Sequence, residues 1–197
     1  MTIPNFGRLV SINNEIAYLF KLYFIFLTFA INSFYLLNHE LKENKMFNLK
    51  ERLQELKLQL PEAPAPAANY VPFVKTGNLL FISGQISSNE NGLIKGVIGK
   101  NMDIDAGYEA ASRCGLSLIA HLDNALEGDF SNFRRIIRLA GFVNSSSDFE
   151  DHPKVLNGAS DLMVKIFGEK GKHMRVAVGA KLPLGVAVEV EGLFEVS

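Results

Sequence analysis

Arg175 and Glu189 are the two residues near the end of the chain whose types and spacing could do chemistry. Each lies in a run of alternating residues, and a Leu-Pro-Leu-Gly break separates the runs, so the sequence predicts two strands joined at a turn. If the turn centres on Leu182, Arg175 lies opposite Glu189. The neighbours of Arg175 on its own face, Ala177 and Gly179, are small and leave room for a ligand. An arginine with space beside it can hold a carboxylate through two parallel hydrogen bonds.

A plainer interpretation fits the same pattern. A cross-strand pair of arginine and glutamate on a solvated sheet face is common and contributes little to stability. The pattern alone therefore leaves a structural ion pair and a ligand site both open.

The other reactive side chains lack the spacings that common metal and cofactor sites need. The four histidines, His39, His121, His152 and His173, have no metal-ligand spacing, and the chain has no phosphate loop and no serine nucleophile elbow. Cys114 is the single cysteine, so it cannot form an internal disulfide, and we expect it to be a small buried hydrophobe. The sequence predicts no metal, no cofactor and no oxidising compartment.

Two segments carry a resemblance to a known family. The runs around Arg175 and Glu189 resemble the closing hairpin of the RidA/YjgF family, also called the endoribonuclease L-PSP, chorismate mutase-like domain. Residues 76–86, Thr-Gly-Asn-Leu-Leu-Phe-Ile-Ser-Gly-Gln-Ile, preceded by Tyr70, are similar to the family's opening segment. The remaining similar segments follow in the family's order: 105–127, 133–143, Asp148-Phe149 and Asn157. The resemblance covers residues 64–196.

The resemblance implies a fold, an assembly and a reaction. It implies an α+β domain of the chorismate mutase-like (YjgF) type and a homotrimer with sites at the subunit interfaces. It also implies hydrolysis, without a cofactor, of reactive enamines and imines such as 2-aminoacrylate to a 2-keto acid and ammonia. Carried over to this chain, Arg175 binds the substrate carboxylate and Glu189 positions or activates a water. The other carried-over residues line or cover the pocket or hydrogen-bond nearby: Ser83, Gly84, Tyr70 and Asn157.

Several features qualify this assignment. Tyr70 can equally be a packing aromatic residue, and Asn157 a helix-start residue. Ala177 stands where the family often has a cysteine, and the chain is longer than compact family members between Phe149 and Asn157. These departures predict a side branch whose pocket prefers a different substrate.

The elements that must position these residues form one predicted α+β domain over residues 69–197. Apolar faces predict helices over 105–127 and 155–167, and alternation predicts strands over 71–75, 79–83, 93–98, 133–143 and the two final runs. This order favours a mixed sheet with both helices on one face, so oligomerisation is needed to bury the other face. Residues 46–68 precede the domain as a short amphipathic helix over 49–56 and a proline-rich lead-in.

Residues 1–45 allow two interpretations. The apolar stretch 16–37 has the length of a membrane span, and Lys42, Lys45 and Lys50 beyond it favour an anchored domain that faces the cytoplasm. Alternatively, 30 of the first 45 residues are Phe, Ile, Asn, Lys, Tyr or Leu, the amino acids of AT-rich codons, and Met46 begins a clean helix. A translation start at Met46 and a cytoplasmic protein are then expected.

The charge balance bears on the class of partner. Residues 46–197 hold 16 basic and 18 acidic residues, which leaves no electrostatic footprint for nucleic acid. The charge thus counts against RNA, whereas the resemblance implies a small carboxylate-bearing substrate. We interpret Arg134, Arg135 and Arg138 as a solvated or interface cluster. A non-catalytic binder of 2-keto acids through Arg175 is the other alternative, because such a ligand satisfies the same site without turnover.

Overall fold

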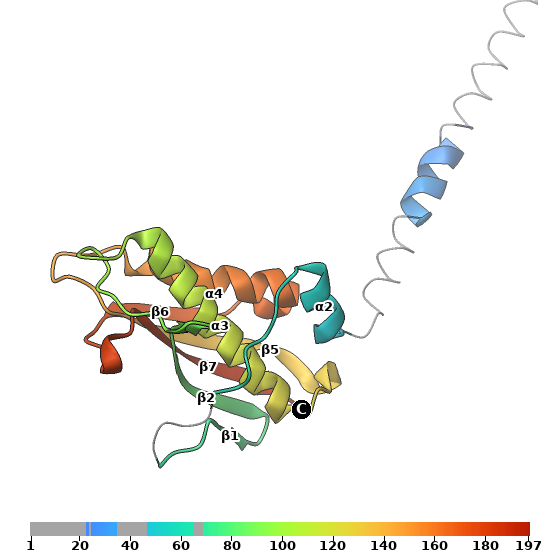
Figure 1. Cartoon of the computed structure of the whole chain (residues 1–197). Helices are drawn as coiled ribbons and strands as arrows, with labels where there is room; N and C mark the ends of the chain where they lie inside the picture. The colour runs from blue at the N-terminus through green and yellow to red at the C-terminus, as the bar shows by residue number, and fades with distance from the viewer. Residues whose placement is uncertain (1–22, 24, 35–46, 65–68) are drawn as a thin grey trace, which may run out of the picture. The chain divides into compact units, whose positions relative to one another are not determined.

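The computed structural model describes Tyr23 and residues 25–34, 47–64 and 69–197 (Figure 1). The chain divides into two compact units, Met1–Met46 and Phe47–Ser197. In the first unit Tyr23 and residues 25–34 are helical, and nowhere in the described ranges is a helix both long and apolar enough to cross a membrane. Most of the predicted span 16–37 lies outside the described residues.

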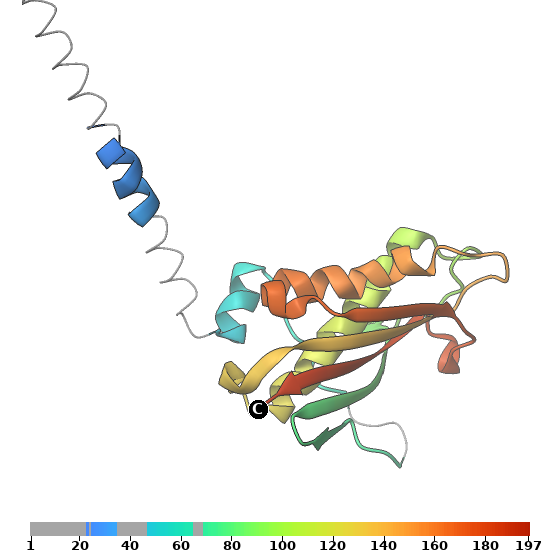
Figure 2. The same cartoon turned by 180° about the vertical axis from the view of Figure 1, so that it is seen from behind.

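The second unit is built on a five-stranded mixed sheet whose one face is covered by two helices (Figures 1 and 2). The strand order is β1-β2-β7-β5-β6, and β5 and β6 are parallel while the other neighbours are antiparallel. The strands are β1 (Phe73–Thr76), β2 (Leu79–Ile86), β5 (Phe133–Val143), β6 (Met174–Gly179) and β7 (Val188–Val196). The predicted α+β class, with both helices on one face, is confirmed.

The two long helices, α3 (Ile104–Ala125) and α4 (His152–Phe167), pack against each other over the sheet. Gly158 makes this contact possible, because a Cβ there would overlap the backbone carbonyl of Tyr108 on α3. Helix α4 begins at His152, three residues before the predicted start at residue 155. Pro153 suits the first turn of a helix, whereas the apolar period that marks the helix in the sequence begins only at Val155.

A short helix in the lead-in, α2 (Leu49–Glu55), packs onto the same unit. Leu49 and Leu53 are buried in the core. The ring of Phe47 lies 5.4 Å from that of Phe167 at the end of α4, centroid to centroid. Arg52 Nη2 donates a 2.7 Å hydrogen bond to the carbonyl of Lys165, where the last turn of α4 leaves carbonyls without helical partners. The lead-in thus stabilises the C-terminal end of α4.

The predicted closing hairpin is wrong. Strands β6 and β7 are antiparallel, as in a hairpin, but β5 lies between them and pairs with both. Arg175 is level with Leu139 of β5, and Glu189 is level with Phe142. Residues 180–187 are long enough to cross a neighbouring strand, a span of about 10 Å, and alternation within two runs cannot show that a third strand separates them.

The predicted strand over 93–98 is also largely wrong. Only Gly92–Leu93 form a strand, β4, which pairs with β3 (Ser88–Asn89) in a separate two-stranded hairpin. The following residues make isolated bridges from Lys95 and Ile98. Gly96, where a Cβ would press against the side chain of Met102, interrupts the regular ladder.

Candidate functional site

Arg175 is held at the edge of the sheet by neutral groups. Its Nη1 donates to Asn157 Oδ1 at 2.8 Å and to Ser160 Oγ at 3.1 Å, both on α4. Among the described residues, four other arginines pair with carboxylates: Arg52, Arg113, Arg135 and Arg138. In the described part of the chain no carboxylate lies within 4.0 Å of the exposed Arg175 guanidinium. The neutral acceptors therefore fix the direction of Arg175 without cancelling its charge, and within the described residues its Nη2 and Nε make no hydrogen bond.

Glu189 lies on the opposite face of the sheet. Alternation along β7 puts Val188 and Val190 in the core and Glu189 on the face that the helices leave open. Gly84 on β2 lies against it so closely that an added Cβ would overlap the carboxylate of Glu189. Burial, and secondarily the charge of Glu191, raises the pKa of Glu189 above its ordinary value. A half-buried carboxylate of raised pKa is suited to accept a proton.

A cavity of about 410 Å³ opens beside Glu189. Its walls are mostly apolar, and polar contacts come from few side chains. It is lined by Pro64, Tyr70, Pro72, Gly84, Gln85, Ile86, Ser88, Leu93, Pro183, Leu184 and Glu189. Three of the predicted site residues, Tyr70, Gly84 and Glu189, thus meet in one cavity.

The turn η3 (Pro183–Gly185) supplies an exposed apolar residue at this cavity. Leu184 adopts φ 58°, the left-handed region that residues other than glycine rarely occupy, and its side chain is 63% exposed. Strained backbone of this kind gathers at ligand-binding sites, because only the surrounding structure keeps it in place. Leu184 is a candidate contact for a substrate side chain, and only its Leu-Pro-Leu-Gly setting marked it in the sequence.

Gln85 and His121 form a buried pair behind the cavity, which the sequence analysis did not include in the site. Gln85 Nε2 donates to the carbonyl of Ser83 at 3.0 Å, and Gln85 Oε1 lies 3.1 Å from His121 Nε2. An amide oxygen can only accept, so His121 carries its proton on Nε2. Burial lowers the pKa of His121 and keeps it neutral. The glutamine of the Ser-Gly-Gln motif was the one signal that could have revealed this support.

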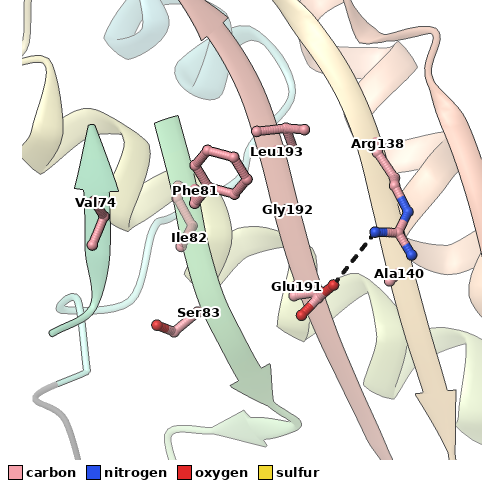
Figure 3. A pocket seen from close by; sticks show the side chains of 9 residues that line it. All are labelled: Val74, Phe81, Ile82, Ser83, Arg138, Ala140, Glu191, Gly192 and Leu193. Atoms are coloured by element: carbon pink, nitrogen blue, oxygen red, sulfur yellow. Dashed lines mark ion pairs between the residues drawn. The ribbon is translucent and has the colours of Figure 1, made fainter. Parts of the chain in front are cut away.

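Ser83 lies in a second hollow, of about 210 Å³, on the open face of the sheet (Figure 3). Its hydroxyl donates to the carbonyl of Val71 at 2.9 Å, so it ties the segment just before β1 to β2. Across the hollow, Arg138 pairs with Glu191 at 3.8 Å. Arg135 also pairs with Glu195, at 2.9 Å. Two of the three arginines in the predicted cluster, Arg135 and Arg138, are therefore paired with carboxylates on this face.

The predicted site is therefore divided within one chain. Arg175 of β6 and Asn157 of α4 lie together on the helix-covered face, whereas Tyr70, Gly84 and Glu189 meet on the other face of the sheet. Strand β5 separates the two groups, and two strand spacings alone amount to about 10 Å. Arg175 and Glu189 of the same chain do not act on one ligand.

Cys114 lies outside the candidate site. Cys114 is fully buried, as predicted, and its thiol contacts the carbonyl of Val188 at 3.4 Å. Burial raises the pKa of this thiol, so the nucleophilic thiolate is strongly disfavoured. Across the described ranges, no group of three or more His, Cys, Asp and Glu side chains could hold a metal ion.

Comparison with known proteins identifies relatives over most of the second unit. Residues 50–191 match the family described as "YjgF/chorismate mutase-like, putative endoribonuclease". Protein TCP17 of Trypanosoma cruzi is 44% identical over 148 residues, which cover 74% of this chain and 92% of that protein. Protein HMF1 of Saccharomyces cerevisiae is 31% identical over 133 residues, which cover 66% of this chain and 87% of that protein.

Two solved structures have closely similar folds. Atu1372 of Agrobacterium tumefaciens, a protein of unknown function, has a TM-score of 0.70 at 40% identity and covers 76% of this chain and 92% of its own. A structure from Shewanella oneidensis MR-1 described as a "putative endoribonuclease" has a TM-score of 0.72 at 35% identity and covers 76% of this chain and 99% of its own.

Proposed function

The chain belongs to the YjgF/chorismate mutase-like family, which supports a role of the general RidA type, and on that premise we propose that it hydrolyses carboxylated imines. The products are a 2-keto acid and ammonia, and no cofactor takes part. The active site is shared between neighbouring copies of the chain in a homotrimer.

The observation that carries the proposal is the state of Arg175. Its guanidinium is exposed, is directed by two neutral acceptors and has no carboxylate to neutralise it in the described residues. The structural ion pair that the sequence also allowed therefore does not hold Arg175 in place. A substrate carboxylate can instead accept hydrogen bonds from the remaining donors of the guanidinium, on Nη2 and Nε.

The cavity at Glu189 supports the chemical step. A water attacks the imine carbon, and the Glu189 carboxylate accepts a proton from it, so that a carbon–oxygen bond forms and the imine π electrons move to nitrogen. Glu189 then returns this proton to the nitrogen, which gives the neutral carbinolamine. In the second step the hydroxyl proton passes by way of Glu189 to the nitrogen, so the carbon–nitrogen bond breaks, ammonia leaves and the carbonyl of the keto acid forms. Because the imine is already electrophilic, orientation beside one water is most of the catalytic task.

Two features favour sharing the site between copies. Arg175 lies on an edge strand, β6, while Glu189 of the same chain faces the other side of the sheet. The open face also exposes apolar side chains across the sheet: Val74, Phe81, Met174, Val176 and Val178. Burying this face against further copies removes apolar surface from water and can bring one copy's Arg175 to another copy's Glu189.

The test measures ammonia and keto acid formed from imines that an amino-acid lyase or oxidase generates. We expect acceleration above the spontaneous rate, and a loss of at least about 100-fold in Arg175→Ala, because carboxylate orientation is lost. Arg134→Ala, at another exposed arginine, is the matched control and should remain active. Turnover retained in Arg175→Ala would exclude the proposed role.

The same assay separates an enzyme from a binder. If the protein binds 2-keto acids through Arg175 but releases no ammonia from any imine, the binding function replaces the catalytic one. A steep fall of activity on RNA with rising salt would instead support an endoribonuclease.

A further inference from the structure

We propose that Ser160 and His173 are positioning residues that hold Arg175 in its ligand-binding orientation, and that His173 must be neutral to do so. The inference rests on the proposed function, in which Arg175 binds the substrate carboxylate. The inference concerns the two residues that orient Arg175 and does not identify the substrate.

A continuous chain of hydrogen bonds connects these residues to the backbone. Arg175 Nη1 donates to Ser160 Oγ at 3.1 Å, and Ser160 Oγ lies 3.1 Å from His173 Nε2. On its other side, His173 Nδ1 lies 2.6 Å from the carbonyl oxygen of Gly171. The arginine is thereby tied, through two side chains, to a fixed point of the turn η2 (Gly168–Gly171).

Only one assignment of protons to this hydrogen-bond network is consistent. The carbonyl of Gly171 can only accept, so His173 Nδ1 carries a proton. In a neutral imidazole Nε2 is then an acceptor, and the hydroxyl of Ser160 donates to it. With its proton committed, Ser160 presents a lone pair to Arg175, which can only donate. Each hydrogen bond of this network thus has one defined donor and one defined acceptor.

Protonation of His173 breaks this assignment. Nε2 becomes a donor, so the hydroxyl of Ser160 loses its acceptor, and two cationic groups that repel each other then donate to the same oxygen. Burial and the nearby charge of Arg175 both lower the pKa of His173, against an opposing contribution from the bond to Gly171. The neutral form is therefore favoured near neutral pH, and the positioning fails as the pH falls.

The charged groups around His173 are otherwise engaged. On η2 and just after it, Glu169 pairs with Lys172 at 2.7 Å, and Lys170 donates to the carbonyl of Phe133 at 3.3 Å. On α4, Asp161 accepts from the hydroxyl of Tyr108 at 3.0 Å. Arg175 is the charged side chain that acts on His173 directly.

The spacing of the residues explains why they meet. His173 and Arg175 are two apart, so an extended backbone directs both side chains to the same side. Asn157 and Ser160 are three apart on α4 and share one face of the helix. The two acceptors of Arg175 and the histidine behind them therefore converge between one helix and one strand.

The test measures the affinity of a 2-keto acid, 2-oxobutanoate, by calorimetry from about pH 5 to 8, the range in which histidines titrate. This ligand stays ionised over that range and does not turn over, so proton transfer by Glu189 is not part of the readout. Wild-type affinity should fall at low pH. In Ser160→Ala the affinity should fall by about five-fold at neutral pH, because one of the two acceptors of Arg175 is lost.

Two variants distinguish positioning from folding. Ser160→Thr keeps the hydroxyl and should retain wild-type affinity. His173→Gln keeps an acceptor that cannot titrate, so its affinity should lose the pH dependence. The control is His152→Gln at the other serine–histidine pair, where Ser145 Oγ lies 2.9 Å from His152 Nε2, and it should keep the wild-type pH profile.

Each outcome decides a different claim. If Ser160→Ala binds as tightly as the wild type, or His173→Gln keeps the wild-type pH profile, the inference is overturned, while loss of binding in Arg175→Ala still supports the proposed function. If Arg175→Ala binds as well as the wild type, the proposed function fails first, and the inference fails with it.

Discussion

The surroundings of Arg175 and of Glu189 differ in almost every physical respect. Arg175 is exposed and is surrounded by hydroxyl, amide and imidazole groups that direct it but carry no opposite charge. Glu189 is half-buried beside an apolar cavity, and its pKa is raised. The first environment preserves a positive charge for a ligand, and the second makes a carboxylate more basic. In the proposed mechanism, carboxylate binding and proton acceptance thus belong to two different regions of the fold.

Glu189→Gln should give the largest change. The amide fills the same space but cannot accept a proton, so we expect kcat to fall by about 100-fold or more while KM changes little. Steady-state imine hydrolysis measures both constants. Glu195→Gln, on the same face of β7, is the control and should leave kcat unchanged. An equal loss in both variants would mean that the open face acts through its overall charge.

Leu184→Ala should give an intermediate change that depends on the substrate. Removing this side chain from the apolar cavity should lower kcat/KM by about 10-fold for imines with large apolar side chains. For 2-aminoacrylate, which is too small to reach across the cavity, kcat/KM should stay within about two-fold. A ranking of imines by side-chain size in both proteins tests this. A uniform loss for all imines would assign Leu184 to the turn rather than to substrate selection.

Glu191→Gln should give the smallest change, a shift of the pH profile. In the proposed mechanism Glu189 acts as a base in its ionised form, so its raised pKa predicts that kcat falls, on acidification, at a higher pH than for an ordinary glutamate. The charge of Glu191 contributes to that rise, so its removal should move the acidic limb of kcat to lower pH, by less than about one unit. A shift in the opposite direction would contradict the assigned cause.

The sequence predicted the parts of the fold that local patterns determine. Alternation along 133–143 predicted β5 with its observed bounds, and the apolar face of α3 predicted that helix to within two residues at either end. The order of strands in the sheet was beyond reach, because pairing between β5 and its neighbours depends on contacts far apart in the chain. The predicted meeting of Arg175 with Glu189 failed for this reason alone.

The site residues divide in the same way. Tyr70, Gly84 and Glu189 could be selected from motif positions, and the structure brings them to one cavity. His121 could not, because a histidine on an apolar helix face is indistinguishable from an ordinary core residue until its contact with Gln85 is seen. His173 was noted only for lacking metal-ligand spacing, since its hydrogen-bond partner comes from another element.

The position of β5 between β6 and β7 has a genetic consequence. If neighbouring copies share each site as proposed, two inactive proteins, Arg175→Ala and Glu189→Gln, should complement each other when mixed and reassembled. A ring of three that contains both variants has one junction where an intact arginine meets an intact glutamate, so an equal mixture should regain about a quarter of wild-type activity. A cell carrying two different damaged copies of the gene would then retain function that neither copy supplies alone.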